Sequence, residues 1–284
     1  MSQIAEQLNS ETEAAYYVSD SNVIAADAAR VHVSSSESDS ISKEARKAAA
    51  EVDAAGKHEP QLRENGIPKE VLEKLLPGDD VITLDEPTVA GGIGYRFIKR
   101  TFDVCSTGLA LVVLAIPMAA IALKIKSESP GPAIYAQERV GKDGKYFKVY
   151  KFRSMYIDAE ARGARWAAGD DPRVTSFGKF MRKMRIDEIP QFWNIFKGDM
   201  SLVGPRPERP AFCKEFEKRI HGWHYRTYVR PGLSGLAQVT GGYDLLPKEK
   251  VELDLWYIEH RSFIQDWKII LKTLGIVSSG EGAR

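Results

Sequence analysis

The feature that most constrains this chain is a run of 20 residues without a charge, from 104 to 123. A straight helix of that length reaches about 30 Å, the thickness of a bilayer's hydrocarbon core. Pro117 lies inside the run, where it removes a backbone hydrogen bond and bends or breaks a helix. Basic residues flank both ends, and the positive-inside tendency assigns both flanks to the cytoplasm. A helix bent at Pro117 that enters the inner leaflet and returns satisfies this pattern. A spanning helix and a buried core helix remain alternatives.

Charge is distributed unevenly along the chain. Residues 1–98 hold 9 basic and 18 acidic side chains, whereas residues 99–284 hold 31 basic and 21 acidic ones. The second part is therefore predicted to meet an anionic partner, such as a lipid surface or phosphates, with an ordinary mixed surface as the alternative. Cys105 and Cys213 are the only cysteines, which argues against a disulfide framework and favours a reducing cytoplasm. The first 14 residues lack a signal-peptide core, so secretion is not expected.

Three regions follow from composition and pattern. Residues 1–94 are rich in Ala, Ser, Glu and Asp, which predicts a polar, mostly disordered extension. Within it, apolar residues at helical spacing predict one short helix over 68–76. Residues 95–126 are predicted to form the basic flank and the re-entrant membrane helix. Residues 127–284 are then the cytoplasmic catalytic domain.

Local patterns indicate a helix-dominated α/β fold. Residues 133–137 and 146–152 read as two strands around a glycine-containing turn, which predicts a short β-hairpin. Phe177, Phe180, Met181 and Met184 mark one face of a basic amphipathic helix, which suits a membrane surface or a core-facing position equally well. We therefore expect a small membrane-associated α/β domain with a re-entrant hydrophobic helix hairpin, amphipathic interfacial helices and the short β-hairpin.

Two adjacent carboxylates, Asp187 and Glu188, stand just before Pro190 and a second helical pattern. Helix capping explains acids at such a position, because Asp is a favoured N-cap and the helix dipole stabilises negative charge there. A chemical role is the alternative, since Arg182 and Arg185 lie upstream and Arg206 is held between two prolines. A pyrophosphate donor needs such arginines. One carboxylate could attack phosphorus, and the other could help to hold Mg²⁺.

Seven segments resemble, in order, the bacterial sugar transferase family, the monotopic phosphoglycosyl transferases. The resemblance runs from residue 99 to about residue 275, and residues 1–94 fall outside it. The segments are 99–103 (KRTFD), 137–141 (QERVG), 150–155 (YKFRSM), 171–175 (DPRVT), 187–191 (DEIPQ), 198–207 (GDMSLVGPRP) and 230–239 (RPGLSGLAQV).

The resemblance implies an activity at the inner membrane of a bacterium. Such a monotopic enzyme, with its catalytic domain facing the cytoplasm, transfers a sugar-1-phosphate from a UDP-sugar to polyprenyl (undecaprenyl) phosphate. It thereby initiates exopolysaccharide, capsule, lipopolysaccharide or glycoprotein glycan assembly. The donor sugar is not readable from the sequence, and a homodimer remains open as a further partnership.

The same resemblance assigns roles to individual residues. Asp187 would be the nucleophile, forming an aspartyl phosphosugar, and Glu188 would complete the pair and assist Mg²⁺, although either carboxylate could be the metal ligand. The expected phosphate or substrate contacts are Arg153, Arg182, Arg185, Gln191 and Arg206. One departure concerns the membrane bend, where the family often has Ser-Pro and this chain has Ile116-Pro117.

Three other classes of function compete with this interpretation. A membrane-anchored binding protein accounts for the hydrophobic run but not for the acids beside arginines. A nucleotide-sugar hydrolase shares the chemistry but uses water as acceptor and needs no lipid. Nucleic-acid binding is the weakest, because no recognised motif for it is present.

Overall fold

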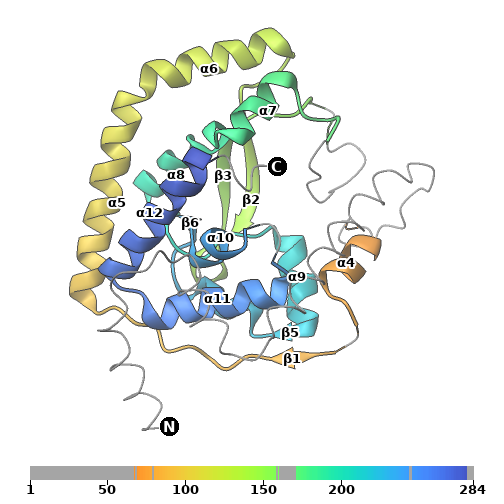
Figure 1. Ribbon diagram of the computed structural model, residues 1–284, viewed down its shortest axis with the longest axis vertical. Coiled ribbons are helices and arrows are strands. Elements are labelled where there is room, and N and C mark those ends of the chain that lie inside the picture. Colours follow the sequence, from red (N-terminus) through yellow and green to blue (C-terminus); the bar gives the residue numbers. More distant parts are fainter. Residues whose placement is uncertain are drawn as a thin grey trace.

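The computed structural model describes residues 67, 69–78, 80–157, 159, 171–242 and 245–279. The expectations for residues 1–66, including most of the disordered extension, lie outside the described residues. Helices dominate the described part, as expected (Figure 1). Its elements in chain order are α4 (Lys69–Leu75), β1 (Ile82–Thr83), α5 (Ile93–Val113), α6 (Ala115–Glu128), β2 (Ile134–Val140), η1 (Lys142–Gly144), β3 (Tyr146–Phe152), α7 (Ser176–Lys183), η2 (Ile186–Glu188), α8 (Gln191–Lys197), β4 (Ser201–Val203), α9 (Pro210–Arg219), β5 (Ile220–His221), η3 (Trp223–Tyr228), β6 (Gly232–Ser234), α10 (Leu236–Thr240), α11 (Pro247–His260) and α12 (Phe263–Ser279).

The uncharged run forms the end of α5 and most of α6, which meet at Leu114. Pro117 is the third residue of α6, so its ring faces the carbonyl of Val113, four residues earlier, and offers it no N–H. The helix therefore breaks one turn before the proline rather than at it. By length and composition, no single helix among the described residues qualifies as a membrane span, whereas α5 and α6 qualify together as a pair bent by 61°.

This bend is the part of the expected re-entrant hairpin that the described residues show. Figure 1 shows α5 along one side of the molecule and α6 leaving it as the second limb of an open elbow, not folding back alongside it. The helix breaks as the proline requires, and a bend of this size fits either a broken span or a re-entrant segment. The described residues therefore contain a bent apolar helix pair.

Polar contacts join α5 to the rest of the domain. The Lys99 ammonium lies 2.7 Å from the carboxylate of Asp266 on α12. The Arg100 guanidinium donates to the carbonyls of Ile195 (2.6 Å) and Phe196 (2.8 Å) near the end of α8. Asp103, only 2% exposed, accepts a hydrogen bond from the backbone N–H of Leu202 on β4. These charged residues therefore anchor the apolar helix to α8, β4 and α12.

The predicted β-hairpin is confirmed, and its first strand is longer than expected. Strands β2 and β3 pair antiparallel from Ile134 opposite Phe152 to Val140 opposite Tyr146. The turn between them includes Asp143, at φ 56°, and the positive-φ Gly144, conformations that Asp and Gly tolerate. Two parallel pairs, β1 with β5 and β4 with β6, complete the strands of the described residues.

The main hydrophobic core lies among α9, η3, α10, α11 and α12, and it includes residues that precede α5. Ile67, Leu72 and Leu75 are buried in the same cluster as the core residues of α9 and α11. The helix predicted over 68–76 is thus present as α4 (Lys69–Leu75), and the buried residues Ile67, Leu72 and Leu75 belong to the folded domain rather than to a disordered extension. The other buried members are Val203, Phe212, Phe216, Ile220, Trp223, Val229, Leu236, Ala237, Val251, Leu253, Leu255, Tyr257, Ile258 and Ile269.

Candidate functional site

Asp187 and Glu188 lie on the 3-10 turn η2, between α7 and α8. Arg185, in the left-handed conformation at φ 52° and ψ 21°, reverses the chain after α7 and starts this turn. Neither acid caps α8, whose N-cap position is Pro190 with no side-chain hydrogen bond. Capping of α8 therefore does not explain the two carboxylates. They are 9% and 8% exposed, and both line a cavity.

Glu188 is tightly paired with two cations. Its Oε1 accepts from Lys151 Nζ at 2.7 Å, from strand β3, and from Arg206 Nη2 at 2.5 Å, from the loop after β4. Burial opposes ionisation of Glu188, but Arg206 and then Lys151 outweigh it and hold its pKa well below the usual range. Glu188 is therefore a fixed negative charge at the centre of a basic site.

Asp187 has the opposite character. Among the described residues, its carboxylate makes no hydrogen bond or ion pair of its own. Burial raises the pKa of Asp187, Lys151 opposes that effect, and the neighbouring charge of Glu188 adds to it. An uncommitted carboxylate, only partly stabilised as an anion, is available to form a bond to an electrophile. The two adjacent acids thus differ because only one has cations within bonding distance.

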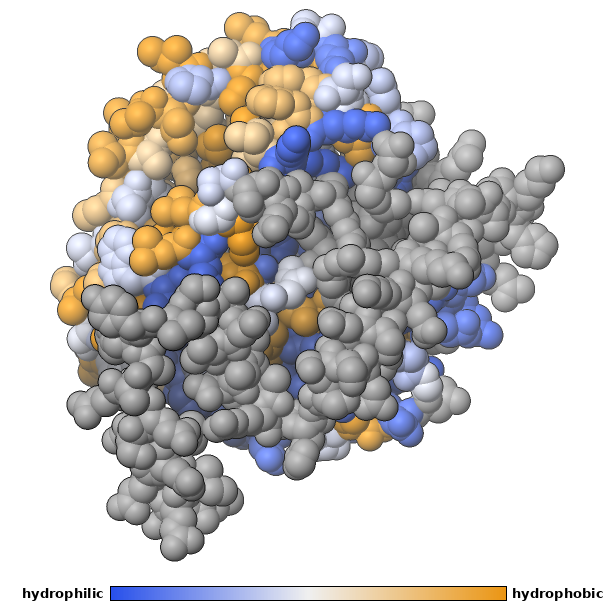
Figure 2. All heavy atoms as spheres, viewed as in Figure 1, coloured by the Kyte–Doolittle hydropathy of each residue, from blue (hydrophilic) through white to orange (hydrophobic). Residues whose placement is uncertain are grey.

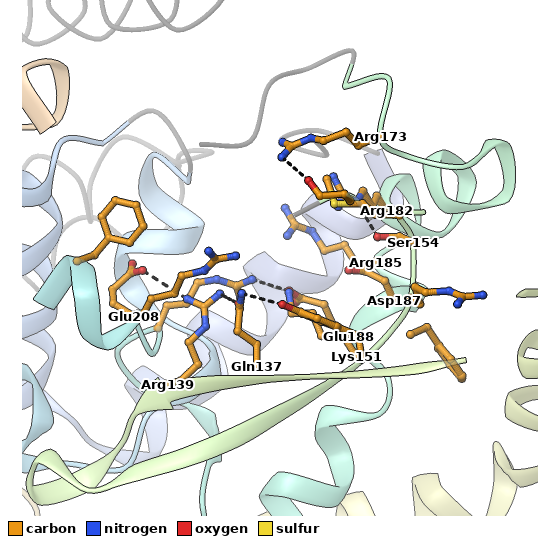
Figure 3. Close-up of a pocket in the computed structure, with 18 of the residues that line it drawn as sticks. Gln137, Arg139, Lys151, Ser154, Arg173, Arg182, Arg185, Asp187, Glu188 and Glu208 are labelled. Carbon is orange, nitrogen blue, oxygen red and sulfur yellow. Dashed lines mark hydrogen bonds and ion pairs between the residues drawn. The ribbon is translucent and has the colours of Figure 1, made fainter. Parts of the chain in front are cut away.

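The cavity in front of these acids has a volume of about 500 Å³, large enough for a nucleotide-sized ligand. Figure 3 shows side chains from β2, β3, α7 and the start of α9 converging on it. Positive charge dominates its wall, so it suits an anionic ligand such as a pyrophosphate. The basic residues that line it are Arg139, Lys151, Arg153, Arg173, Arg182, Arg185, Arg206, Arg209 and Lys250.

Two glycines set the position of Arg206. A Cβ on Gly232 would lie 2.1 Å from the nitrogen of Gly204, so β4 and β6 approach each other too closely for side chains there. The N–H of Gly204 donates to Ser234, and the N–H of Gly232 donates to Pro205, both at 2.9 Å. These bonds fix the chain on both sides of the turn that delivers Arg206 to Glu188.

The sequence-predicted arginines all line the cavity, but they are engaged differently. Arg182 donates through Nε to the hydroxyl of Ser154 at 2.9 Å, and Arg185 lies beside Asp187 in the turn. Arg153 donates to the carbonyls of Pro130 (2.6 Å) and Ser129 (2.7 Å) and to the Ser129 hydroxyl (3.0 Å). Arg153 thus holds the chain that follows α6, and its phosphate contact stays a prediction.

Two other predicted residues lie away from the cavity wall. Gln191 is 2% exposed at the first position of α8, and its side-chain Nε2 has no hydrogen-bond partner among the described residues. Pro117 lies on α6, where it favours the break between α5 and α6. Gln191 is therefore not brought to the cavity surface with Asp187 and the arginines.

Lys151 and a second polar cluster were not singled out as site residues from the sequence. Arg139 donates to the Gln137 side chain at 2.5 Å and to the carbonyl of Pro207 at 3.1 Å. Glu208 lies 3.6 Å from Arg139 and also pairs with Lys250. Burial opposes its ionisation, yet Lys250, Arg226 and Arg139 together lower the pKa of Glu208 to about 2. For Lys151, a signal was available: the two-residue period of a strand puts it on the face of Arg153.

The donor atoms of the acid pair limit the kind of metal site that it can form. The described residues contain no group of three or more His, Cys, Asp and Glu side chains that could hold a metal ion. Mg²⁺, however, is commonly bound by one or two carboxylates together with waters and substrate phosphates. Asp187 and Glu188, facing a cavity suited to phosphates, fit that kind of shared site and do not fit a cage made by the protein alone.

Comparison with known proteins agrees with this chemistry. The profile described as bacterial sugar transferase matches residues 94–280. A UDP-N-acetylgalactosamine-undecaprenyl-phosphate N-acetylgalactosaminephosphotransferase of Aeromonas hydrophila is 47% identical over 67% of this chain and 46% of its own length. A putative undecaprenyl-phosphate N-acetylgalactosaminyl 1-phosphate transferase of Bacillus subtilis is 53% identical over 51% of this chain and 78% of its own.

A third relative extends the range of sugars. The UDP-glucose:undecaprenyl-phosphate glucose-1-phosphate transferase of Escherichia coli is 41% identical over 63% of this chain and 40% of its own length. The chain thus spans less than half of the Aeromonas and Escherichia proteins that it matches. The family profile covers α5 to α12 and with them every residue of the cavity wall. The chain belongs to the bacterial sugar transferase family.

Proposed function

We propose that this protein transfers a sugar-1-phosphate from a UDP-sugar to undecaprenyl phosphate, the step that initiates assembly of a bacterial polysaccharide or other glycan. The observation that carries this proposal is the uncommitted carboxylate of Asp187, beside the salt-bridged Glu188, in a cavity lined by arginines and lysines. The names of the relatives support the acceptor and the class of donor. Because those names differ in their sugars, the sugar of this chain is left unassigned.

In the first step, an oxygen of Asp187 bonds to the phosphorus that carries the sugar. The bond from that phosphorus to the bridging oxygen breaks, and UMP leaves with the electron pair. In the second step, a phosphate oxygen of undecaprenyl phosphate attacks the same phosphorus, and the bond to Asp187 breaks. The products are undecaprenyl diphosphosugar and a regenerated carboxylate. Holding the reactants in line with Asp187 is the main contribution of the cavity.

In this scheme, the basic residues of the cavity wall neutralise the negative charge of the donor's pyrophosphate. Arg182 comes from α7 and Arg206 from the loop after β4, and Arg206 is oriented by its bond to Glu188. Such preorganised cations stabilise charge that develops on the leaving UMP. Glu188 and Asp187 are the residues that would hold Mg²⁺, which supplies further neutralisation of the pyrophosphate. Arg153, Arg185 and Gln191 stay as predicted contacts.

The membrane setting is part of the proposal. Apolar side chains are widely exposed along α5 and α6, with Ile93 80% and Ile116 82% exposed. In Figure 2 hydrophobic residues gather over the side of the molecule formed by these helices. Exposed aromatic and aliphatic side chains on α7 and its C-cap, on α8 and on α12 suit the interface of a bilayer. They are Phe180, Met184, Trp193, Phe196, Phe263, Ile264, Trp267, Leu271 and Leu274.

These surfaces support a monotopic association with the cytoplasmic leaflet of the inner membrane, in which the bent pair α5 and α6 re-enters the leaflet. The catalytic domain then faces the cytoplasm, where UDP-sugars are made available. A second copy of the chain as a partner stays a prediction.

The experiment uses purified protein, a panel of UDP-sugars and Mg²⁺, with and without undecaprenyl phosphate. The proposal predicts steady UMP release only with the lipid, and without it a mass increase of one phosphosugar that maps to Asp187. Steady release without lipid would identify a hydrolase instead. No release and no adduct with any donor would favour a binding protein, and an adduct on another residue would move the catalytic centre.

A further inference from the structure

The segment before the family match is integrated into the domain. We call residues 67–90 the strap; residues 68 and 79 are not among those described. Figure 1 shows it running from α4, beside α9, past the β1–β5 pair to the start of α5. The N–H of Leu84 donates to His221 at 2.9 Å, and the N–H of Ala90 donates to Ile258 at 3.0 Å. The strap therefore contacts the domain near its start, in its middle and at its last residue, although the family profile begins only at residue 94.

Helix α9 and the strand that follows it share several interactions with the strap. Leu72 and Leu75 of α4 are buried in one hydrophobic cluster with Phe212 and Phe216 of α9. At the other end of α9, Arg219 donates to the carbonyls of Leu76 and Gly78, which follow α4. Strand β5, directly after α9, pairs with β1 of the strap. The strap thus holds α9 through an apolar face, a side-chain cap and a strand pairing.

The same helix forms part of the cavity wall. Phe212 and Phe216 line the cavity, and so do Glu208 and Arg209, which immediately precede α9. Figure 3 shows Glu208 and Arg139 on one side of the cavity and Asp187 with Ser154 on the other. A shift of α9 therefore moves the wall of the cavity that lies across from Asp187.

The chemistry of that wall suits the donor. It combines aromatic rings with the charged groups of Glu208, Arg209 and Lys250, which can contact the rings and hydroxyls of a nucleotide-sugar. The cavity wall near α6 and α7 instead exposes Ile134, Tyr135 and Ile157, which suits a prenyl chain. Accordingly, we infer that the strap is a positioning element for donor binding, acting through α9 on the wall that receives the nucleotide-sugar beyond its phosphates. This inference rests on the proposed transferase function.

The test compares full-length variants of the strap. Leu72→Ala/Leu75→Ala removes the apolar contact, and Arg219→Ala removes the cap while leaving the core intact. The matched control is Glu73→Ala, because Glu73 lies on the exposed face of the same helix. The Michaelis constants for UDP-sugar and for undecaprenyl phosphate are measured separately, with active sites counted from the amount of phosphosugar adduct. UDP binding is measured in parallel without turnover.

Both strap variants are expected to raise the Michaelis constant for UDP-sugar about tenfold and to weaken UDP binding to a similar extent, with the lipid constant unchanged. The control should match wild type. A merely structural role would lower the number of active sites but leave both constants unchanged, and this result would overturn the inference. Arg219→Ala decides the case if the double variant does not fold. If wild type lacks transferase activity, the proposed function fails, whereas UDP binding still reports on the strap.

Discussion

Lys151 Nζ lies 2.7 Å from Glu188 Oε1, which joins strand β3 to the turn η2 across 37 positions of sequence. Through this contact the β-hairpin becomes part of the candidate active site and not only a support for it. Burial raises the pKa of the neighbouring Asp187 and Lys151 opposes that rise, so one lysine stabilises the anionic form of both acids.

Replacing Lys151 is expected to change the pH dependence of turnover. In Lys151→Met the pKa values of Asp187 and Glu188 both rise, because a cation that favoured their charged forms is lost. Activity needs an ionised Asp187, so the acidic limb of the pH–rate profile moves to higher pH. Profiles of kcat/KM between about pH 4 and 9 check this. Lys148→Met on the exposed part of β3 is the control, and a limb that stays in place in Lys151→Met would contradict the assignment.

Asp187→Asn separates a chemical role from a structural one. Asn keeps the shape of the side chain but is a far poorer nucleophile, so turnover and the phosphosugar adduct should both disappear. The unfolding midpoint should stay close to that of wild type, because Asp187 makes no hydrogen bond within the described residues. Glu188→Gln should slow turnover by about 10² to 10³, the usual effect of losing one electrostatic contact in a site. Intact-protein mass spectrometry and UMP release measure both variants, and normal turnover in Asp187→Asn would refute its role.

Arg153→Met tests what the buried guanidinium does. Its bonds to Ser129 and Pro130 hold the chain after α6, so their loss should lower the free energy of unfolding by about 1–3 kcal/mol. Chemical denaturation measures this loss. A phosphate contact by Arg153 would instead appear as a higher Michaelis constant for the UDP-sugar in the folded fraction. Lys145→Met, at an exposed turn position, controls for the loss of one positive charge.

Pro117→Leu should straighten the bent helix pair. Leucine restores the N–H that can bond to the carbonyl of Val113 and removes a helix-breaking term of about 3 kcal/mol. Reporters fused at residues 1 and 284 are expected on the cytoplasmic side in wild type, whereas part of the Pro117→Leu population should show them on opposite sides. Ile116→Leu alters the exposed neighbour without restoring the hydrogen bond, so it should behave as wild type. Identical topology in all three proteins would show that Pro117 does not determine on which side of the membrane the two ends lie.

Sequence patterns predicted those parts of the fold that depend on neighbouring residues. The hairpin follows from alternation around a turn, α4 from its helical spacing, and the break before Pro117 from the missing N–H. The contact of Lys151 with Glu188 depends on how distant segments pack, which no local period encodes. The packing of α4 against the domain was not predicted for the same reason. The apolar face of α4 stands within a polar stretch of sequence and does not identify the residues that it contacts.

The candidate site shows the same division. Asp187 and Glu188 were open to a capping interpretation because their sequence neighbourhood fits one, and only the placement of Pro190 at the N-cap excludes it for α8. Conversely, Arg153 has the residue type of a phosphate ligand, yet its guanidinium bonds to Ser129 and Pro130. Residue type limits what a side chain can bind, whereas the surrounding backbone decides which of those groups it meets.

The contacts that anchor α5 also fix the position of this helix relative to the acid pair. Asp103 bonds to the strand that leads to Arg206, and Arg100 bonds to the end of α8, whose start follows the acid pair. In the proposed membrane setting, the depth of α5 in the leaflet therefore dictates the height of Asp187 above the headgroups. The phosphate group of a lipid acceptor can move only a limited distance from the bilayer surface. Bilayer thickness and headgroup size thereby become variables of the reaction rate, even for a donor that arrives from water.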